Sequence, residues 1–90
     1  MGTQSYVELI RAYLRGEMAF DEFESRFQSS LVDDEEERDR DADLALMAIE
    51  AANQIVSPEL EPGEGDKLHL STEDFKKELE GYLRRLEATL

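Results

Sequence analysis

The sequence predicts an all-α protein, folded as an antiparallel four-helix bundle in a single domain that covers residues 1–90. Apolar residues recur at helical spacing in four segments, at about residues 5–15, 19–31, 39–56 and 72–89. The connections between them are short, which is typical of helices that pack side by side in opposite directions. A chain of 90 residues has room for one core, to which all four helices must contribute.

The first two helices are predicted to form a hairpin. The apolar stripe of the first helix follows the spacing i, i+3, i+4, i+7, i+8 and consists of Tyr6, Leu9, Ile10, Tyr13 and Leu14. Ser5 and Glu8 have the spacing of a capping box, and Gly16 stands where a left-handed residue commonly follows a helix. The second stripe consists of Phe20, Phe23, Phe27 and Leu31. Because only a few residues separate the two stripes, we expect antiparallel neighbours.

The third helix is predicted to be apolar over much of its circumference. Its stripe comprises Leu44, Met47, Ala48, Ala51, Ala52 and Ile55, widened by Leu46, Ile49 and Val56. Such a helix is expected at the centre of a domain, where its alanines permit the close approach of a neighbouring helix. Ser57 and Pro58 are expected to end it.

The fourth helix follows a loop, residues 59–66, that contains a proline and two glycines. Leu68 and Leu70 alternate with polar residues, which predicts a short extended segment. Ser71 and Asp74 have the spacing of a helix cap. The stripe of the helix consists of Phe75, Leu79, Tyr82, Leu83, Leu86 and Leu90. Gly81 interrupts this stripe without an evident role.

The apolar stripes predict which side chains lie in the core and which lie at its rim. We expect Phe23, Phe27, Leu79 and Leu83 to lie in the core. The three tyrosines share stripes with leucines, so they are expected at the rim of the core with their hydroxyls reaching water: Tyr6, Tyr13 and Tyr82.

The charge balance limits the possible partners. The chain has 23 acidic residues against 10 lysines and arginines, a formal net charge of −13. Such a charge repels phosphate backbones and anionic lipids, so we expect neither nucleic acid nor a membrane as a partner, and a charged partner should be basic. The absence of cysteine excludes disulfides, thiolate metal sites and a thiol nucleophile. No export signal or membrane span is evident, and we expect a cytoplasmic protein.

The residue patterns that suggest enzymatic or metal chemistry are weak. Asp39, Asp41, Asp43 and Glu50 occupy positions 1, 3, 5 and 12 of a calcium-loop template. The template requires glycine at position 6 and the chain has Leu44, inside a predicted helix. His69 is the only histidine, and no acid–base pair accompanies it. We therefore expect no enzyme, no cofactor and no metal.

Two acidic segments are the candidate partner-binding residues. They are Asp33, Asp34, Glu35, Glu36, Glu37 and Asp39 before the third helix, and Glu59, Glu61 and Glu64 after it. Two interpretations are open: the segments bind a basic partner, or they are solvated runs that keep the protein soluble. A helix of about a dozen residues spans roughly 18 Å, so the two segments need not form one patch.

Residues 9–23, LIRAYLRGEMAFDEF, together with Phe27, resemble the opening hairpin of the colicin D-type immunity proteins. In that family an L-x-x-[FY]-L-x-G-x-[IM] stretch leads to an E-F-x-x-x-F helix. A central helix, an acidic loop with a proline and a closing amphipathic helix follow, and residues 56–60 and 79–86 stand where the last parts would be. The resemblance covers nearly the whole chain, although its motifs are packing motifs.

The resemblance implies a bacterial immunity protein, an antitoxin made beside a bacteriocin or a contact-dependent inhibition toxin. Such a protein binds the toxin's nuclease domain in the cytoplasm and occludes its active site. The best-known targets of the family cleave tRNA, and carboxylates that stand in for phosphates can compete for a basic cleft. The partner so implied is a cognate basic nuclease toxin. The run from Asp33 to Asp43 is more acidic than the family pattern, which leaves open a toxin unrelated to the tRNA nucleases. The alternative is an acidic helical adaptor or regulator of another basic protein.

Overall fold

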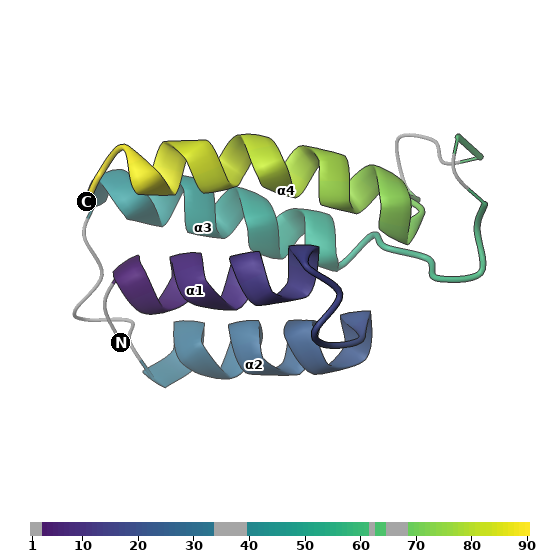
Figure 1. Cartoon of the computed structure of the whole chain (residues 1–90), viewed down its shortest axis with the longest axis horizontal. Helices are drawn as coiled ribbons and strands as arrows, with labels where there is room; N and C mark the ends of the chain where they lie inside the picture. The colour runs from purple at the N-terminus through teal and green to yellow at the C-terminus, as the bar shows by residue number, and fades with distance from the viewer. Residues whose placement is uncertain (1–2, 34–39, 62, 65–68) are drawn as a thin grey trace.

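A computed structural model describes residues 3–33, 40–61, 63–64 and 69–90, in which four helices form an antiparallel bundle (Figure 1). The helices are α1 (Thr3–Leu14), α2 (Phe20–Asp33), α3 (Arg40–Asn53) and α4 (Thr72–Glu87). Their directions alternate along the chain, and α4 packs against both α3 and α1. The contact between α2 and α3 is the least extensive of the four contacts between neighbouring helices. The predicted all-α four-helix bundle is confirmed.

The hairpin of α1 and α2 turns at Gly16, as the sequence indicates. Gly16 has a φ of +80°, and its N–H donates to the carbonyl of Tyr13 at 3.0 Å. The N–H of Glu17 donates to the carbonyl of Ala12 at 3.0 Å, so both hydrogen bonds of a Schellman motif are present. The predicted capping box is wrong, because α1 is already helical at Thr3 and Ser5 lies inside it.

The core is centred on aromatic rings from α1, α2 and α4. The ring of Tyr13 stacks on that of Phe23 with centroids 4.6 Å apart, and Phe75 meets Phe20 edge to face at 5.6 Å. Tyr6 contacts Phe27 in the same edge-to-face manner at 5.7 Å. The buried residues of the core are Tyr6, Val7, Ile10, Tyr13, Phe23, Phe27, Leu31, Ala42, Ala45, Leu46, Ile49, Ala52, Phe75, Leu79 and Leu86.

The predicted core is confirmed at three positions and corrected at others. Phe23, Phe27 and Leu79 are fully buried, whereas Leu83 is only partly buried at the edge of the core. Tyr6 and Tyr13 are buried rather than at the rim, because α2 and α4 close over α1 and leave their rings no path to water. Tyr82 is partly buried, as expected at a core rim.

The position of α3 differs from the prediction. Its buried face carries Ala42, Ala45, Leu46, Ile49, Ala52 and Asn53. Leu44, Met47 and Ala51 are exposed, so α3 is not surrounded by neighbours. The physical reason is that a four-helix bundle covers each helix on its inner side only. The helix also ends at Asn53, three residues before the predicted end at residue 56.

The connection from α3 to α4 contains the predicted extended segment. Val56 and Leu70 form an isolated parallel bridge, in which the N–H of Leu70 donates to Ile55 at 2.8 Å and the N–H of Ser57 donates to Leu70 at 2.7 Å. Leu68 lies outside the described residues. Ser71 caps α4 as predicted, since its Oγ accepts the N–H of Asp74 at 3.1 Å.

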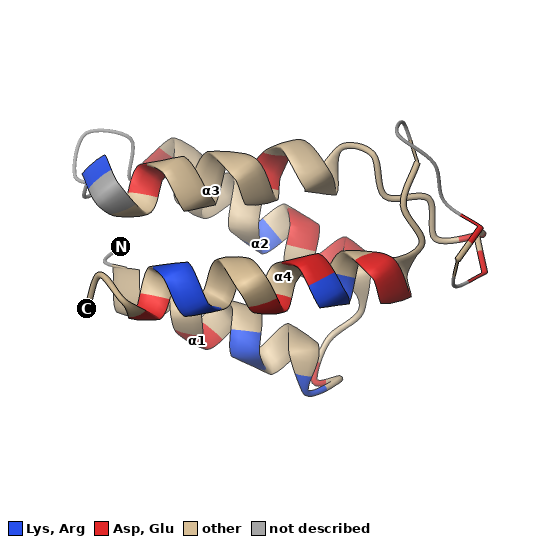
Figure 2. Cartoon of the chain, turned by 90° about the horizontal axis from the view of Figure 1, so that it is seen from above, with Lys and Arg blue, Asp and Glu red and all other residues tan. Residues whose placement is uncertain are grey.

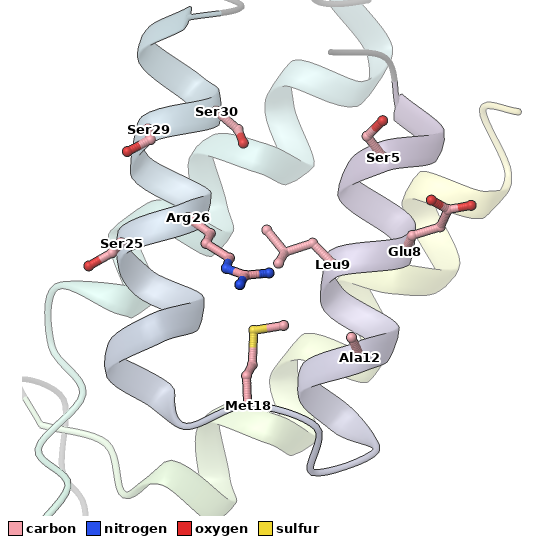
Figure 3. A pocket seen from close by; sticks show the side chains of 9 residues that line it. All are labelled: Ser5, Glu8, Leu9, Ala12, Met18, Ser25, Arg26, Ser29 and Ser30. Carbon is pink, nitrogen blue, oxygen red and sulfur yellow. The ribbon is translucent and has the colours of Figure 1, made fainter.

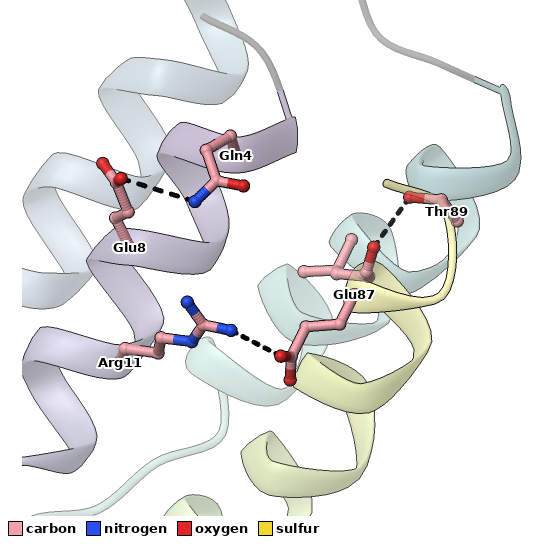
Figure 4. A network of polar contacts seen from close by, with 6 residues as sticks. Gln4, Glu8, Arg11, Glu87 and Thr89 are labelled. Carbon is pink, nitrogen blue, oxygen red and sulfur yellow. Dashed lines mark hydrogen bonds and ion pairs between the residues drawn. The ribbon is translucent and has the colours of Figure 1, made fainter.

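The end of α4 comes earlier than predicted. The helix ends at Glu87, two residues before the predicted end, and Ala88 is its C-terminal cap residue. Leu90 therefore lies beyond the last turn and is 62% exposed, so its place in the predicted stripe is wrong. The ion pair between Arg11 and Glu87 joins α1 to this last turn (Figure 4).

Candidate functional site

The described members of the two predicted acidic segments lie at opposite ends of the bundle. Asp33 is exposed at the end of α2, at the end of the bundle where α3 begins, while Asp34–Glu37 and Asp39 lie outside the described residues. Glu59, Glu61 and Glu64 are exposed in the connection that follows α3, at the far end of a molecule 36 Å long (Figure 1). The structure therefore does not bring the described members of the predicted set into one site.

The connection that carries the second acidic segment is held by its own hydrogen bonds. The carboxylate of Glu64 accepts the N–H of Glu61 at 2.6 Å. The N–H of Gly63 donates to the carboxylate of Asp74 on α4 at 3.2 Å, and Gly63 has a φ of +84°. Glu64 thus serves the turn, whereas the side chains of Glu59 and Glu61 stand exposed to a partner or to water.

A pair of glutamates between α2 and α3 was not among the sequence-predicted residues. The amide of Gln28 donates to Oε1 of Glu50 at 2.9 Å, which joins the two helices. The other oxygen of Glu50 is buried without a hydrogen-bond partner among the described residues. Burial, and then the negative charges of Glu50 and Asp21, raise the pKa of Glu24 above its ordinary value. No local pattern could have indicated this pair, because Glu24 and Glu50 are distant in sequence and meet only through the fold.

The acidic charge is divided unequally between two halves of the bundle. The neighbouring helices α2 and α3 carry seven acids against two bases, a net charge of −5. The neighbouring helices α1 and α4 carry six acids against five bases, a net charge of −1. Figure 2 shows the two signs interspersed along α4. Among the helices, a basic partner would therefore be attracted mainly to the half formed by α2 and α3.

Exposed apolar side chains lie on the same half. Val32 on α2 and Leu44 and Met47 on α3 are exposed, although the sequence placed the last two in an inward stripe. The width of the apolar stripe on the third helix could have indicated that some of these side chains are exposed. Apolar residues on so many sides of one helix exceed what the inner face of a four-helix bundle can cover.

An open groove of about 590 Å³ lies between α1 and α2 (Figure 3). The side chains of Leu9, Met18 and Arg26 point into it. Arg26 pairs with Glu22 at 2.9 Å, and Glu8 bonds to Gln4 at 3.4 Å on its own helix. Because its charged groups are engaged elsewhere, the groove offers an apolar surface rather than a set of reactive groups.

The calcium-loop template coincides with a regular helix. Asp43, Leu44 and Glu50 all lie on α3, so the sharp bend that a calcium loop makes at its sixth position does not form at Leu44. Asp39 and the side chain of Asp41 lie outside the described part of the chain. Within that part, no three side chains of His, Cys, Asp or Glu gather as they would around a metal ion.

Comparison with known proteins adds no family to these observations. No protein-family model, curated protein or solved structure matches the chain. Within the described residues, no helix has the length and apolar character needed to cross a membrane.

Proposed function

We propose that this protein is an immunity protein of the colicin D type, which binds and neutralises a basic nuclease toxin in the cytoplasm. The toxin would be a tRNA-cleaving nuclease if it follows the best-known members of that family. In this proposal the protein is not an enzyme and carries no cofactor. Its carboxylates occupy the basic cleft that the toxin uses for polyanionic RNA, and the active site is thereby occluded.

The observation that carries the proposal is the unequal distribution of charge on a small helical bundle. A solvated charge serves solubility wherever it stands, so solubility alone does not require the α2–α3 half to hold a net charge of −5 and the α1–α4 half only −1. A cluster of one sign accelerates the encounter with a partner of the opposite sign. Asp33, exposed at the end of α2, is one of the acids of this cluster.

The first experiment tests neutralisation directly. The protein is co-expressed with the product of the gene directly upstream of its own, and growth of the host is scored. Rescue of growth from a nuclease toxin supports the proposal. A neighbouring gene product that is not toxic, or a toxin from which the protein gives no protection, contradicts it and favours the alternative of an acidic adaptor for another basic protein.

The second experiment assigns the acidic segments. In one variant Asp33, Asp34, Glu35, Glu36 and Glu37 become the corresponding amides, and in the other Glu59, Glu61 and Glu64 do. At least one variant should bind the toxin with a slower on-rate that approaches the wild-type rate as salt screens the attraction. A carboxylate buried against a toxin arginine or lysine should also raise the off-rate, at a cost of roughly 2 to 5 kcal/mol. If both variants bind and protect like the wild type at low salt, recognition does not depend on the acidic segments.

A further inference from the structure

The described residues contain few large apolar side chains that are exposed, and three of them lie on α2 and α3. Val32 is 75% exposed, Leu44 78% and Met47 40%. Scattered exposed apolar residues are normal in a small protein and need no explanation. These three matter only if the fold brings them together.

The register of α2 against α3 brings them together. The hydrogen bond from Gln28 to Glu50 fixes which turns of the two helices face each other. Val32 lies one turn after Gln28 on α2, and Met47 lies one turn before Glu50 on α3. Because the two helices are antiparallel, both steps lead toward the same end of the seam, and Leu44 follows one turn further along.

The seam between α2 and α3 is hollowed. A shallow groove of about 350 Å³ lies there, lined by Gln28, Leu31, Val32 and Glu50. The contact between α2 and α3 is the least extensive among the neighbouring helices, which leaves this seam open.

Carboxylates border this apolar seam. Glu24 and Glu50 repel each other across it, and Asp33 follows Val32 at the end of α2. Glu50 is partly exposed, so its carboxylate can also accept from a cationic donor of a partner. On the α1–α4 side, by contrast, Arg11 already neutralises Glu87.

We propose that the seam between α2 and α3 is the docking face, and that it binds a basic amphipathic surface of the partner protein. Apolar side chains of the partner cover Val32, Leu44 and Met47, while its lysines or arginines reach Glu24 and Glu50. The identity of that partner as a nuclease toxin rests on the proposed function. The location of the face rests only on the exposed apolar residues and the charges of α2 and α3.

A synthetic peptide tests the location without the toxin. The probe is an 18-residue amphipathic helix of leucine and lysine, which is titrated into ¹⁵N-labelled protein. The salt concentration is about 0.15 M, at which exposed charges farther apart than about 8 Å are screened from each other. The expected shifts in amide resonances are confined to α2 and α3 around Val32, Met47 and Glu50. Shifts spread over α1 and α4, or no binding at millimolar peptide, would overturn the proposal.

Matched variants separate the apolar contact from general attraction. Leu44→Gln combined with Met47→Gln should weaken peptide binding about tenfold or more, because both exposed side chains belong to the proposed face. Leu90→Gln changes an equally exposed apolar residue at the C-terminal end and should weaken binding less than twofold. Equal weakening by the two would overturn the proposal. Circular dichroism confirms that each variant is folded.

Two double variants that have the same net charge as each other test the role of the carboxylates at the seam. Glu24→Gln with Glu50→Gln should weaken binding several-fold more than Glu78→Gln with Glu80→Gln, which removes two exposed carboxylates from α4. Both double variants lower the negative charge by two, so any difference between them reports position. An equal loss in both would show that the peptide senses total charge, and the proposed face would be wrong.

The same variants distinguish this inference from the proposed function. If the peptide maps to α2 and α3 but the upstream gene product is not a toxin that the protein neutralises, the proposed function fails and the docking face stands. If the protein neutralises the toxin and the variant with Leu44→Gln and Met47→Gln does so with unchanged affinity, the docking face fails and the proposed function stands.

Discussion

Phe23 and Phe27 are the residues on which α2 depends for its place in the bundle. Both are fully buried, and their rings lie 5.6 Å apart between the tyrosines of α1. Replacing either by alanine should cost about 3 to 5 kcal/mol of unfolding free energy, because the deletion removes buried surface and leaves a cavity. Urea denaturation followed by circular dichroism measures the loss. As a control, Val32→Ala at an exposed position of the same helix should change the free energy of unfolding by less than about 0.5 kcal/mol. Losses below about 1 kcal/mol at both phenylalanines would contradict this packing of α2.

Tyr13 couples the stability of the bundle to alkaline pH. Burial, and then the charge of Glu73, raise the pKa of Tyr13 from 10.0 to about 12. Between these two values the unfolded chain releases a proton that the folded protein keeps, so stability is complete below pH 10 and falls as the pH rises toward 12. The fall should reach about 1 kcal/mol near pH 11. Unfolding curves at several pH values should show a smaller fall in Tyr13→Phe, and an unchanged pH dependence in that variant would contradict the cause.

Asn53 is a buried polar residue whose side chain we expect to lower stability. It is 1% exposed, and neither its amide nitrogen nor its amide oxygen has a hydrogen-bond partner among the described residues. Asn53→Leu keeps most of the volume and removes both polar atoms, so it should raise the free energy of unfolding by about 1 to 2 kcal/mol. Asn53→Ala should gain less, because it also leaves a cavity. A loss of more than about 1 kcal/mol in Asn53→Leu would show that the amide is satisfied.

At the scale of the helices, two glycines have opposite effects. Gly16 follows α1 with a φ of +80°, a conformation that strains any residue with a β-carbon. Gly81 lies inside α4, is exposed, and would place an added β-carbon in open space. Gly81 therefore serves no close approach within the described part of the chain, and it weakens the helix.

The two glycines give a matched pair of substitutions. Gly81→Ala should stabilise the protein by about 0.5 to 1 kcal/mol, because alanine loses less backbone entropy in a helix. Gly16→Ala should destabilise it by about 1 to 2 kcal/mol, since the left-handed conformation is unfavourable for alanine. Thermal or urea unfolding of the two variants decides the signs. A destabilised Gly81→Ala would mean that a neighbour approaches this turn of α4.

At the scale of the whole molecule, the net charge of −13 works against compactness. The amide variants of the two acidic segments should keep the helical circular dichroism spectrum, because the described members of both segments are exposed. Their unfolding free energy should equal or exceed that of the wild type by up to about 1 kcal/mol at low salt, and the difference should vanish near 1 M salt. Loss of the helical signal in either variant would show that these carboxylates are needed for folding. A gain in stability that does not depend on salt would exclude charge repulsion as its cause.

The sequence by itself determined the number, the order and most of the ends of the helices. Local chemistry suffices for these features: the phenylalanine spacing of α2, the glycine after α1 and the serine before α4 each act within a turn or two of their own position. Full burial of Phe23, Phe27 and Leu79 also follows from the stripes, because a single small core must use such residues.

Only the tertiary structure decided which side of α3 faces the core and which groups of distant residues meet. Leu44, Met47 and Ile49 are equally apolar in sequence, and the neighbouring helices cover only Ile49 fully. Gln28 pairs with Glu50, and the described members of the two acidic segments lie at opposite ends, because of how the helices pack. Helical periodicity describes one helix at a time, whereas coverage and long-range electrostatics depend on the neighbours that the fold places beside it.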